Sequence, residues 1–408
     1  MKAWPTLGIV VVESILLFGH WLVYTTWIAF HGSLPPSDTP WLRMLAVLLA
    51  FSFVTASLLS FRFSNLPLRI FYKIASLWLG FLNFLFWASW LTWLVWLVVR
   101  YSGLVAEPDA ARPWIVGVLF GLAMLAGFYG ILNARLIRVR KISVSLDGLP
   151  ANWAGRKAVL LSDLHLGNIN GAGFCRRVAA MAARFNPDIV FLPGDLFDGA
   201  KADLDRLTAP LKQLSPPYGI FYSTGNHEEF TSSTHYLGAV TRGGLRNLNN
   251  ECVDVDGLQI AGVSWVESTY PIRMKSALDA MSIDRSRASI LLNHSPSRLP
   301  MVERAGFGLQ LSGHTHGGQI SPFTWLTRRI FGQFTYGLHS FGSLQVYTST
   351  GVGTWGPPMR VGTHSEIVVL TFQPRQPLNE PATEPGITAR EMVREPAPIS
   401  RASAHPRP

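Results

Sequence analysis

The segment Ala158-Val159-Leu160-Leu161-Ser162-Asp163-Leu164-His165 places a carboxylate and an imidazole directly after an apolar run. A short apolar run of this kind predicts a buried strand, so Asp163 and His165 are expected at its carboxyl end. In an extended chain, side chains two residues apart leave on the same side, where these two could chelate one metal ion. Asp-x-His arises easily by chance. It therefore supports a metal site only if other segments of the chain show the same arrangement.

Four further segments place Asp, Asn or His just after an apolar run. They are Gly194-Asp195, Gly225-Asn226-His227-Glu228, Asn293-His294 and Gly313-His314-Thr315-His316-Gly317-Gly318. Taken singly, each could be ordinary turn chemistry or a structural histidine. Taken together they indicate one site, because ligand sites of open α/β sheets form at the carboxyl ends of strands. Their oxygen and nitrogen ligands suffice for two adjacent metal ions, which can hold the attacking and leaving oxygens of a phosphoryl displacement.

The sequence pattern around these motifs is typical of an α/β fold. Apolar runs predict buried strands at 159–161, 189–192, 220–222, 260–263, 290–292 and 309–311. Amphipathic segments predict helices at 174–185 and 202–214, each followed closely by proline. Strands that alternate with helices favour a layered α/β core.

The first third of the chain is typical of a membrane domain. Segments at 7–30, 41–61, 75–99 and 114–132 are nearly free of charge and long enough to span a bilayer. The alternative, an unusually apolar soluble helical domain, is disfavoured by four such segments in succession. We therefore predict a membrane domain at 1–140 with four transmembrane helices, a catalytic domain at 141–373 and a disordered Pro-rich tail at 374–408.

Basic residues near the span ends predict the orientation. One side carries Lys2, Arg62, Arg69, Lys73, Arg135, Arg138, Arg140 and Lys141, and the other carries Arg43, Arg100 and Arg112. The positive-inside rule puts the first side, both termini and the catalytic region in the cytoplasm. Cys175 and Cys252 are then expected to be free thiols. Glu13 and His20, within the first span, are expected to make polar helix–helix contacts rather than to act in function.

The five motifs resemble the pattern of the calcineurin-like metallophosphoesterase superfamily, which is D-x-H, G-D, G-N-H-[DE], a lone His, and G-H-x-H. The resemblance extends over about residues 157–370 and is closest to a small bacterial membrane-associated branch. That branch includes enzymes that cleave UDP-2,3-diacylglucosamine in lipid A synthesis. The resemblance to the superfamily implies a four-layer αββα sandwich with two divalent metal ions. A ligand set of O and N atoms suits Mn, Fe or Zn. By the motif match, one ion would be held by Asp163, His165, Asp195 and His316, and the other by Asp195, Asn226, His294 and His314, with Asp195 as the bridge.

The chemistry expected from this resemblance is metal-dependent hydrolysis of a phosphoester. Two cations lower the pKa of a bridging water, and the resulting hydroxide attacks phosphorus in line. His227 would stabilise the phosphate oxygens and protonate the leaving group. Asp195 and His227 are thus the residues expected to be catalytic.

The expected substrate is lipid-linked and carries a phosphodiester or pyrophosphate bond. Arg328 and Arg329 lie among the aromatic and aliphatic residues of the segment 325–334, a composition that suits an anionic lipid interface and makes both arginines candidate substrate-binding residues. An ordinary loop packed on the site is the alternative. The net charge of +10 also permits a phosphodiesterase for nucleotides or nucleic acid, but no aromatic platform for single strands is evident, so no nucleic-acid partner is expected. A catalytically silent membrane scaffold is disfavoured by the intact set of ligand residues.

Overall fold

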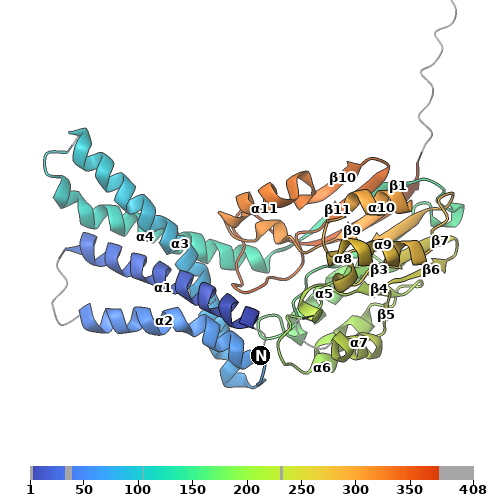
Figure 1. Ribbon diagram of the computed structural model, residues 1–408, viewed down its shortest axis with the longest axis horizontal. Helices are drawn as coiled ribbons and strands as arrows, with labels where there is room; N and C mark the ends of the chain where they lie inside the picture. Colours follow the sequence, from blue (N-terminus) through green and yellow to red (C-terminus); the bar gives the residue numbers. More distant parts are fainter. Residues whose placement is uncertain (1–2, 33–38, 104, 230–232, 376–408) are drawn as a thin grey trace, which may run out of the picture. The chain divides into compact units, whose positions relative to one another are not determined.

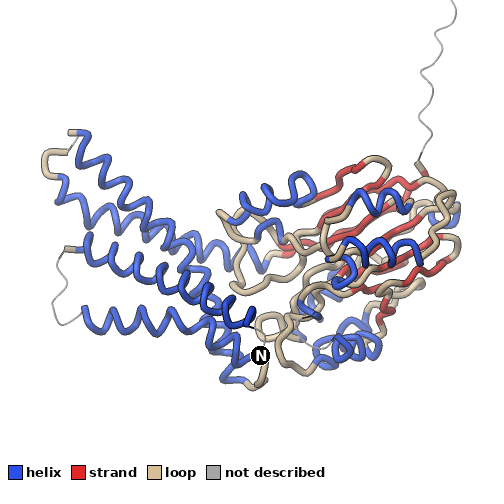
Figure 2. The backbone as a smooth tube through the Cα atoms, viewed as in Figure 1, coloured by secondary structure: helices blue, strands red, loops and turns tan. Residues whose placement is uncertain are grey.

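The computed structural model describes residues 3–32, 39–103, 105–229 and 233–375 (Figures 1 and 2). Its first third contains four helices long and apolar enough to cross a membrane, as predicted. They are α1 (Ala3–His31), α2 (Thr39–Ser60), α3 (Leu66–Ser102) and α4 (Arg112–Arg135), with a short helix η1 (Pro108–Ala111) before the last. Of the tail predicted at 374–408, residues 376–408 lie outside the described residues.

Helix α3 begins well before the span predicted at 75–99. Asn65 caps it by accepting a hydrogen bond from the Leu68 amide at 2.9 Å, and Pro67 lies in its first turn, where no amide donor is needed. Its 37 residues correspond to a length of about 55 Å, whereas the hydrocarbon core of a bilayer is about 30 Å thick. An upright α3 would therefore extend beyond the hydrocarbon core.

The polar residues inside α1 were expected to make helix–helix contacts. Trp78 Nε1 donates to His20 Nε2 at 2.8 Å, while the other ring nitrogen of His20 lies 2.8 Å from the Leu16 carbonyl. This contact confirms the expectation for His20. The Glu13 carboxylate has no hydrogen-bond partner within the described part of the chain.

The rest of the chain builds two six-stranded mixed sheets. The first has the order β1 (Ile137–Leu146), β12 (Ser365–Pro374), β2 (Lys157–Leu160), β3 (Ile189–Pro193), β4 (Ile220–Ser223) and β5 (Leu245–Asn247). The second has the order β10 (Gly337–Phe341), β11 (Leu344–Thr348), β9 (Leu309–Ser312), β8 (Ser289–Leu292), β7 (Leu258–Gly262) and β6 (Glu251–Val255). Strands β2 to β5 are parallel, as are β7, β8, β9 and β11, so their carboxyl ends share one edge of each sheet.

The two sheets pack face to face, and helices cover both outer faces. Leu160 and Phe191 of the first sheet share a buried cluster with Ile290 and Leu311 of the second. The outer face of the first sheet packs on α5 (Ala172–Ala183), α6 (Leu204–Thr208) and α7 (Ser233–Arg242). The outer face of the second packs on α9 (Pro271–Ala280) and α10 (Leu299–Ala305), and α8 (Trp265–Thr269) precedes them. This is the predicted four-layer αββα sandwich.

One predicted helix needs correction, and half of the described strands were not predicted. The helix predicted at 202–214 is split into α6 and the 3-10 helix η3 (Ala209–Gln213), because Pro210 cannot donate the amide hydrogen bond that a continuous helix requires. The strands that were not predicted are β1, β5, β6, β10, β11 and β12. Among them, β12 lies inside the first sheet, although its Ile367-Val368-Val369-Leu370 is as apolar as the runs that were predicted.

The membrane helices contact the catalytic region through hydrogen bonds. Helix α4 is followed by β1 after the single residue Leu136. The side-chain amide of Asn133 donates to the backbone carbonyl of Arg360 at 3.0 Å and to that of Thr363 at 2.8 Å. The backbone amide of Arg360 donates to the Gly130 carbonyl at 2.9 Å. Three of the basic residues counted for orientation, Arg138, Arg140 and Lys141, belong to β1 rather than to a loop.

Candidate metal centre

Side chains from the ends of β2 and β9 form the first half of a buried cluster. His165 Nε2 lies 3.0 Å from His316 Nε2, and His316 Nε2 lies 3.4 Å from Asp163 Oδ1. One ligand atom from each of the three residues fits within 4.8 Å of the others, which is the spacing that a single ion needs. All three are buried.

The second half of the cluster comes from the ends of β3, β4, β8 and β9. Asp195 Oδ2 lies 3.1 Å from His294 Nε2, and Asn226 Oδ1 lies 3.0 Å from His314 Nδ1. Asp195 Oδ2 is also 3.7 Å from His165 Nε2, so its carboxylate lies between the two halves. The structure thus brings together all seven residues predicted as ligands, in an arrangement with room for two ions.

His227 lies beside this cluster. Its amide donates to Asp195 Oδ1 at 3.0 Å, and its Nε2 is 4.0 Å from Asp195 Oδ2. With His165 and Asp195 it also forms a group that could hold an ion. Its ring stands edge-on to His165, with the ring centroids 4.6 Å apart, and Trp355 flanks it at 5.8 Å.

Protonation favours metal binding by this cluster. Burial lowers the pKa of His314 to about 4 and holds the pKa values of His165 and His316 well below their usual range, so these imidazoles are neutral and can act as ligands. Burial opposes a charge on His294 as well, but the adjacent Asp195 and Asp163 carboxylates outweigh it and raise the pKa of His294 to about 9. The Asp195 and Asp163 carboxylates therefore favour a positive charge at this place, and a bound metal ion would provide that charge.

A buried ring nitrogen provides a further test of fit. His165 Nδ1 makes no hydrogen bond with any described residue, although it is shielded from solvent. Buried polar atoms are nearly always satisfied, and a bound ion is one of the ways to satisfy them. The donor set and this unsatisfied nitrogen both suit divalent metal ions.

The backbone at the ligands is strained. Asp163, His165, Asp195, His314 and His316 have φ values of 53°, 47°, 50°, 70° and 48°. Residues with a Cβ rarely adopt this left-handed conformation, which costs on the order of 1–2 kcal/mol each and clusters at functional sites. The extended conformation expected between Asp163 and His165 is therefore wrong; tight turns, and not strand alternation, bring these side chains together.

Glu228 holds one of these turns in place. Its carboxylate accepts hydrogen bonds from the amides of Gly225, Asp195 and Phe197 at 2.8, 3.1 and 2.9 Å. Burial, reinforced by the nearby Asp195, raises the pKa of Glu228 to about 7. Glu228 belongs to a predicted motif but was given no role from the sequence. Its position next to His227 was the only feature of the sequence that pointed to one.

Arg360 is a further residue outside the ligand set that contacts the cluster. It is fully buried, and its guanidinium donates to the His316 carbonyl at 3.3 Å and to the carbonyls of Thr350 and Gly353 at 2.7 and 2.6 Å. Burial lowers the pKa of Arg360 to about 10, which leaves it charged at neutral pH. Arg360 thus ties the turn that carries His316 to the segment held by α4.

A cavity opens beside the cluster. It has a volume of about 520 Å³ and is lined by Gly317, Thr324, Arg328, Tyr336, Thr363 and His364, among others. Gly317 follows the candidate ligand His316 directly, and Arg328 belongs to the helix α11 (Phe323–Phe331) at the border of the cavity. Arg329 does not line the cavity; its guanidinium lies 5.1 Å from the ring centroid of Trp325.

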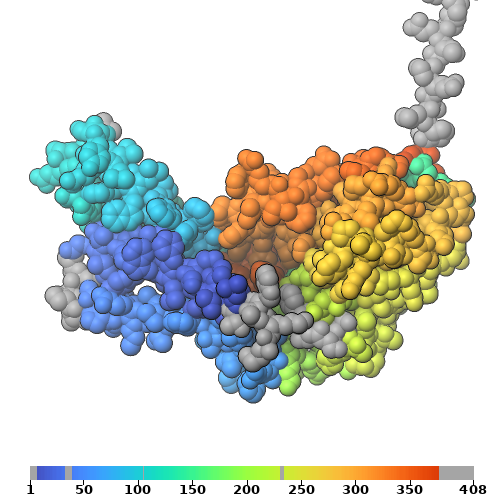
Figure 3. Space-filling model, in the orientation of Figure 1, coloured from blue at the N-terminus to red at the C-terminus, as the bar shows by residue number. Residues whose placement is uncertain are grey.

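Helix α11 presents an apolar surface to solvent. Phe323, Trp325, Leu326 and Ile330 are exposed by 52%, 61%, 46% and 65%. The helix lies on the surface of the catalytic region (orange in Figure 3). Asn83 of α3 donates to the carbonyl of Ser321 at 3.0 Å, directly before the helix. The segment predicted as an interface is therefore an amphipathic helix attached to a membrane helix, rather than an ordinary loop.

The chain is similar to several known proteins. The family model described as calcineurin-like phosphoesterase matches residues 156–318. An uncharacterised metallophosphoesterase of Campylobacter jejuni is 31% identical over 66% of this chain and 74% of that one. A transmembrane protein with metallophosphoesterase domain of Danio rerio is 31% identical, and the match spans 60% of each chain. Among solved structures, a dimetal phosphatase from Danio rerio is 11% identical, with a TM-score of 0.32 over 48% of this chain and 88% of that one.

Proposed function

Because this chain belongs to the calcineurin-like metallophosphoesterase family, we propose that it hydrolyses a phosphodiester or pyrophosphate bond of a lipid-linked substrate, such as UDP-2,3-diacylglucosamine, at the cytoplasmic face of a bacterial inner membrane. The observation that carries the proposal is the position of α11. This amphipathic helix borders a cavity next to His316, and the chain just before it is bonded to the membrane helix α3.

In this proposal, the seven clustered residues hold two divalent ions, either Mn, Fe or Zn. When bound, these ions would supply an activated water and neutralise the charge on the phosphate. Asp195 orients both halves of the site, since its carboxylate reaches His294 and His165. His227 donates a proton to the leaving oxygen, a role for which its place at the border of the cluster is suited.

The cavity beside the cluster suits a headgroup rather than an acyl chain. Its lining is mostly hydroxyls and glycines, and Arg328 provides the charge that a second phosphate would require. The exposed Trp325 and Ile330 of α11 would lie at the lipid boundary, where an aromatic ring and an apolar side chain are both favourable. A lipid-linked substrate could then reach the metal centre without leaving the membrane.

The direct test is release of UMP from UDP-2,3-diacylglucosamine by protein purified in detergent with added manganese. We expect release by the wild type and none by Asp195→Ala. Cleavage of a soluble phosphodiester without any release of UMP would preserve the chemistry and overturn this substrate.

The role of α11 can be tested by charge reversal. Arg328→Glu together with Arg329→Glu should lower turnover of the lipid substrate about tenfold or more and leave turnover of a small soluble ester nearly unchanged, since each lost charged contact is worth on that order. The matched control is Arg184→Glu with Lys212→Glu, which reverses two exposed charges away from α11. Equal losses on both substrates would show that α11 has no part in lipid recognition.

A further inference from the structure

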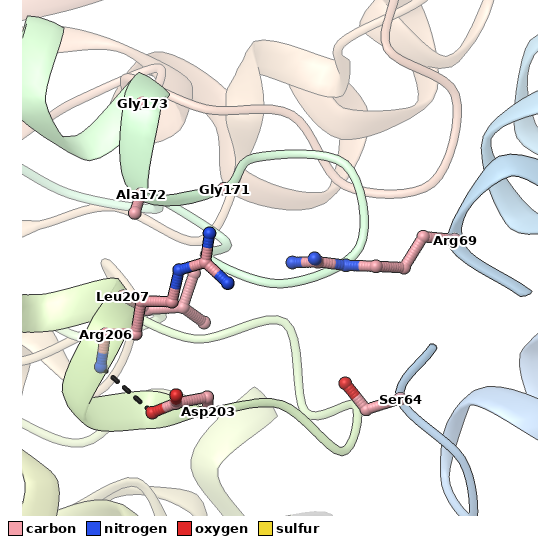
Figure 4. A pocket seen from close by; sticks show the side chains of 8 residues that line it. All are labelled: Ser64, Arg69, Gly171, Ala172, Gly173, Asp203, Arg206 and Leu207. Carbon is pink, nitrogen blue, oxygen red and sulfur yellow. Dashed lines mark hydrogen bonds between the residues drawn. The ribbon is translucent and has the colours of Figure 1, made fainter. Parts of the chain in front are cut away.

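A separate pocket lies where the turn between α2 and α3 meets the catalytic region (Figure 4). It has a volume of about 350 Å³ and is lined by Ser64, Arg69, Gly171, Ala172, Gly173, Asp203, Arg206 and Leu207. The turn is fixed there because the Lys201 amide donates to the Ser60 carbonyl at 3.0 Å. None of these residues belongs to the metal centre.

Two guanidinium groups face each other across this pocket. Arg69 comes from the first turn of α3 and Arg206 from α6, and Figure 4 shows their charged ends directed at one another. Neither has a carboxylate within ion-pairing distance anywhere in the described ranges. Asp203, at the border of the pocket, uses one oxygen to cap α6 by accepting from the Arg206 amide at 3.0 Å. Two like charges that converge without a counterion are unfavourable unless an anion lies between them.

The wall of the pocket adds further donors for an anion. Gly171 to Gly173 form the start of α5, a helix of 12 residues whose N-terminus has no side-chain cap. The first amides of a helix point outward with a partial positive charge and bind anions readily. A Cβ at Gly171 or Gly173 would meet nothing within 4 Å, so the space before these amides is open. The Ser64 hydroxyl completes the lining.

We infer that this pocket binds a phosphate group between Arg69 and Arg206. Guanidinium groups pair with phosphate oxygens through two parallel hydrogen bonds, and two arginines with helix amides match a tetrahedral anion. The pocket lies at the end of two candidate membrane spans, Thr39–Ser60 and Leu66–Ser102. The ends of membrane spans face the phospholipid headgroups of a bilayer. The phosphate could therefore belong to an anionic phospholipid or be free in solution.

The experiment uses full-length protein, stripped of lipid in detergent, with two probes. Phosphatidylglycerol binding is measured by native mass spectrometry, and inorganic phosphate binding by the shift in unfolding temperature relative to chloride at equal ionic strength. The test variant is Arg69→Gln with Arg206→Gln. The control is Arg62→Gln with Arg176→Gln, which removes two exposed charges outside the pocket. Phosphate at the metal centre affects all variants equally, so it cancels in the comparison.

We expect affinity for one of the two probes to fall about tenfold for each guanidinium removed, while the control retains it. Loss of phosphatidylglycerol binding alone identifies a headgroup site, and loss of the phosphate-induced shift alone identifies a site for free phosphate. Unchanged binding of both probes would overturn the inference. If the double variant does not fold, the same comparison is made with Arg206→Gln, because that side chain is exposed and its removal leaves the core intact.

Discussion

At the scale of single residues, His227 could act either as a metal ligand or as a general acid. Its ring contacts that of His165, yet the family pattern leaves it outside the two ligand sets. We expect His227→Ala to lower kcat by about 10²–10⁴, the range for loss of a general acid, with metal content nearly unchanged by elemental analysis. His294→Ala serves as the comparison and should lose metal. Equal loss of metal in both variants would make His227 a ligand instead.

The left-handed backbone at the ligands gives a stability prediction. Without metal, His165→Gly should be more stable than His165→Ala by about 1 kcal/mol, because glycine adopts a φ of 47° without the penalty that a Cβ brings. At His294, which has no positive φ, the order should reverse by about 0.5–1 kcal/mol. Urea denaturation of the four variants in chelator provides the comparison. The same order at both positions would mean that φ strain does not govern these differences.

At the scale of elements, the predicted strands share one property: they are buried on both faces. Val159 and Ile290 belong to such strands, and the run of apolar residues marks each of them. By contrast, β1 is exposed from Arg138 to Lys141 and carries three basic residues there, so it resembles a charged loop in sequence. The convergence of the ligand motifs on one site could be predicted because parallel strands bring their carboxyl ends to one edge of a sheet.

The turns at the metal centre could not be predicted in the same way. The conformation of Asp163 depends on contacts far along the chain, such as the His314 amide, which donates to Asp163 Oδ1 at 3.0 Å. No local signal in the sequence encodes that bond. Arg360 is a similar case, because only the fold reveals that its charge is surrounded by carbonyl groups instead of solvent.

The contact between α4 and the segment that carries Arg360 can be tested with glycine. A Cβ at Gly130 would lie 2.9 Å from Val361 Cγ2 and 3.2 Å from Met359 Cβ, whereas one at Gly121 of the same helix would meet nothing within 4 Å. We expect Gly130→Leu to lower kcat/KM on a soluble ester about tenfold or more, since Arg360 would shift and move the His316 turn with it. Gly121→Leu should have no such effect. Similar kinetics for both variants would show that α4 does not support the metal centre.

At the scale of the whole molecule, the orientation predicted from charge can be measured by labelling. In a background of Cys175→Ala and Cys252→Ala, Ser102→Cys should react with a membrane-impermeant maleimide in intact spheroplasts. Ser64→Cys should react only after lysis, because its side of the membrane carries the excess of basic residues. Both positions are exposed, so burial does not explain a difference between them. The opposite pattern would place the metal centre outside the cytoplasm.

Helix α3 is longer than a bilayer is thick, and α4 passes into β1 after one residue. A helix of fixed length tilts in a thin membrane and stands more upright in a thick one. Since the sheets are attached to these helices by hydrogen bonds, their height above the headgroups would change with the tilt. Lipids with longer or shorter acyl chains would therefore tune access of a membrane-bound substrate to the catalytic edge, while reaction with dissolved esters would be insensitive to chain length.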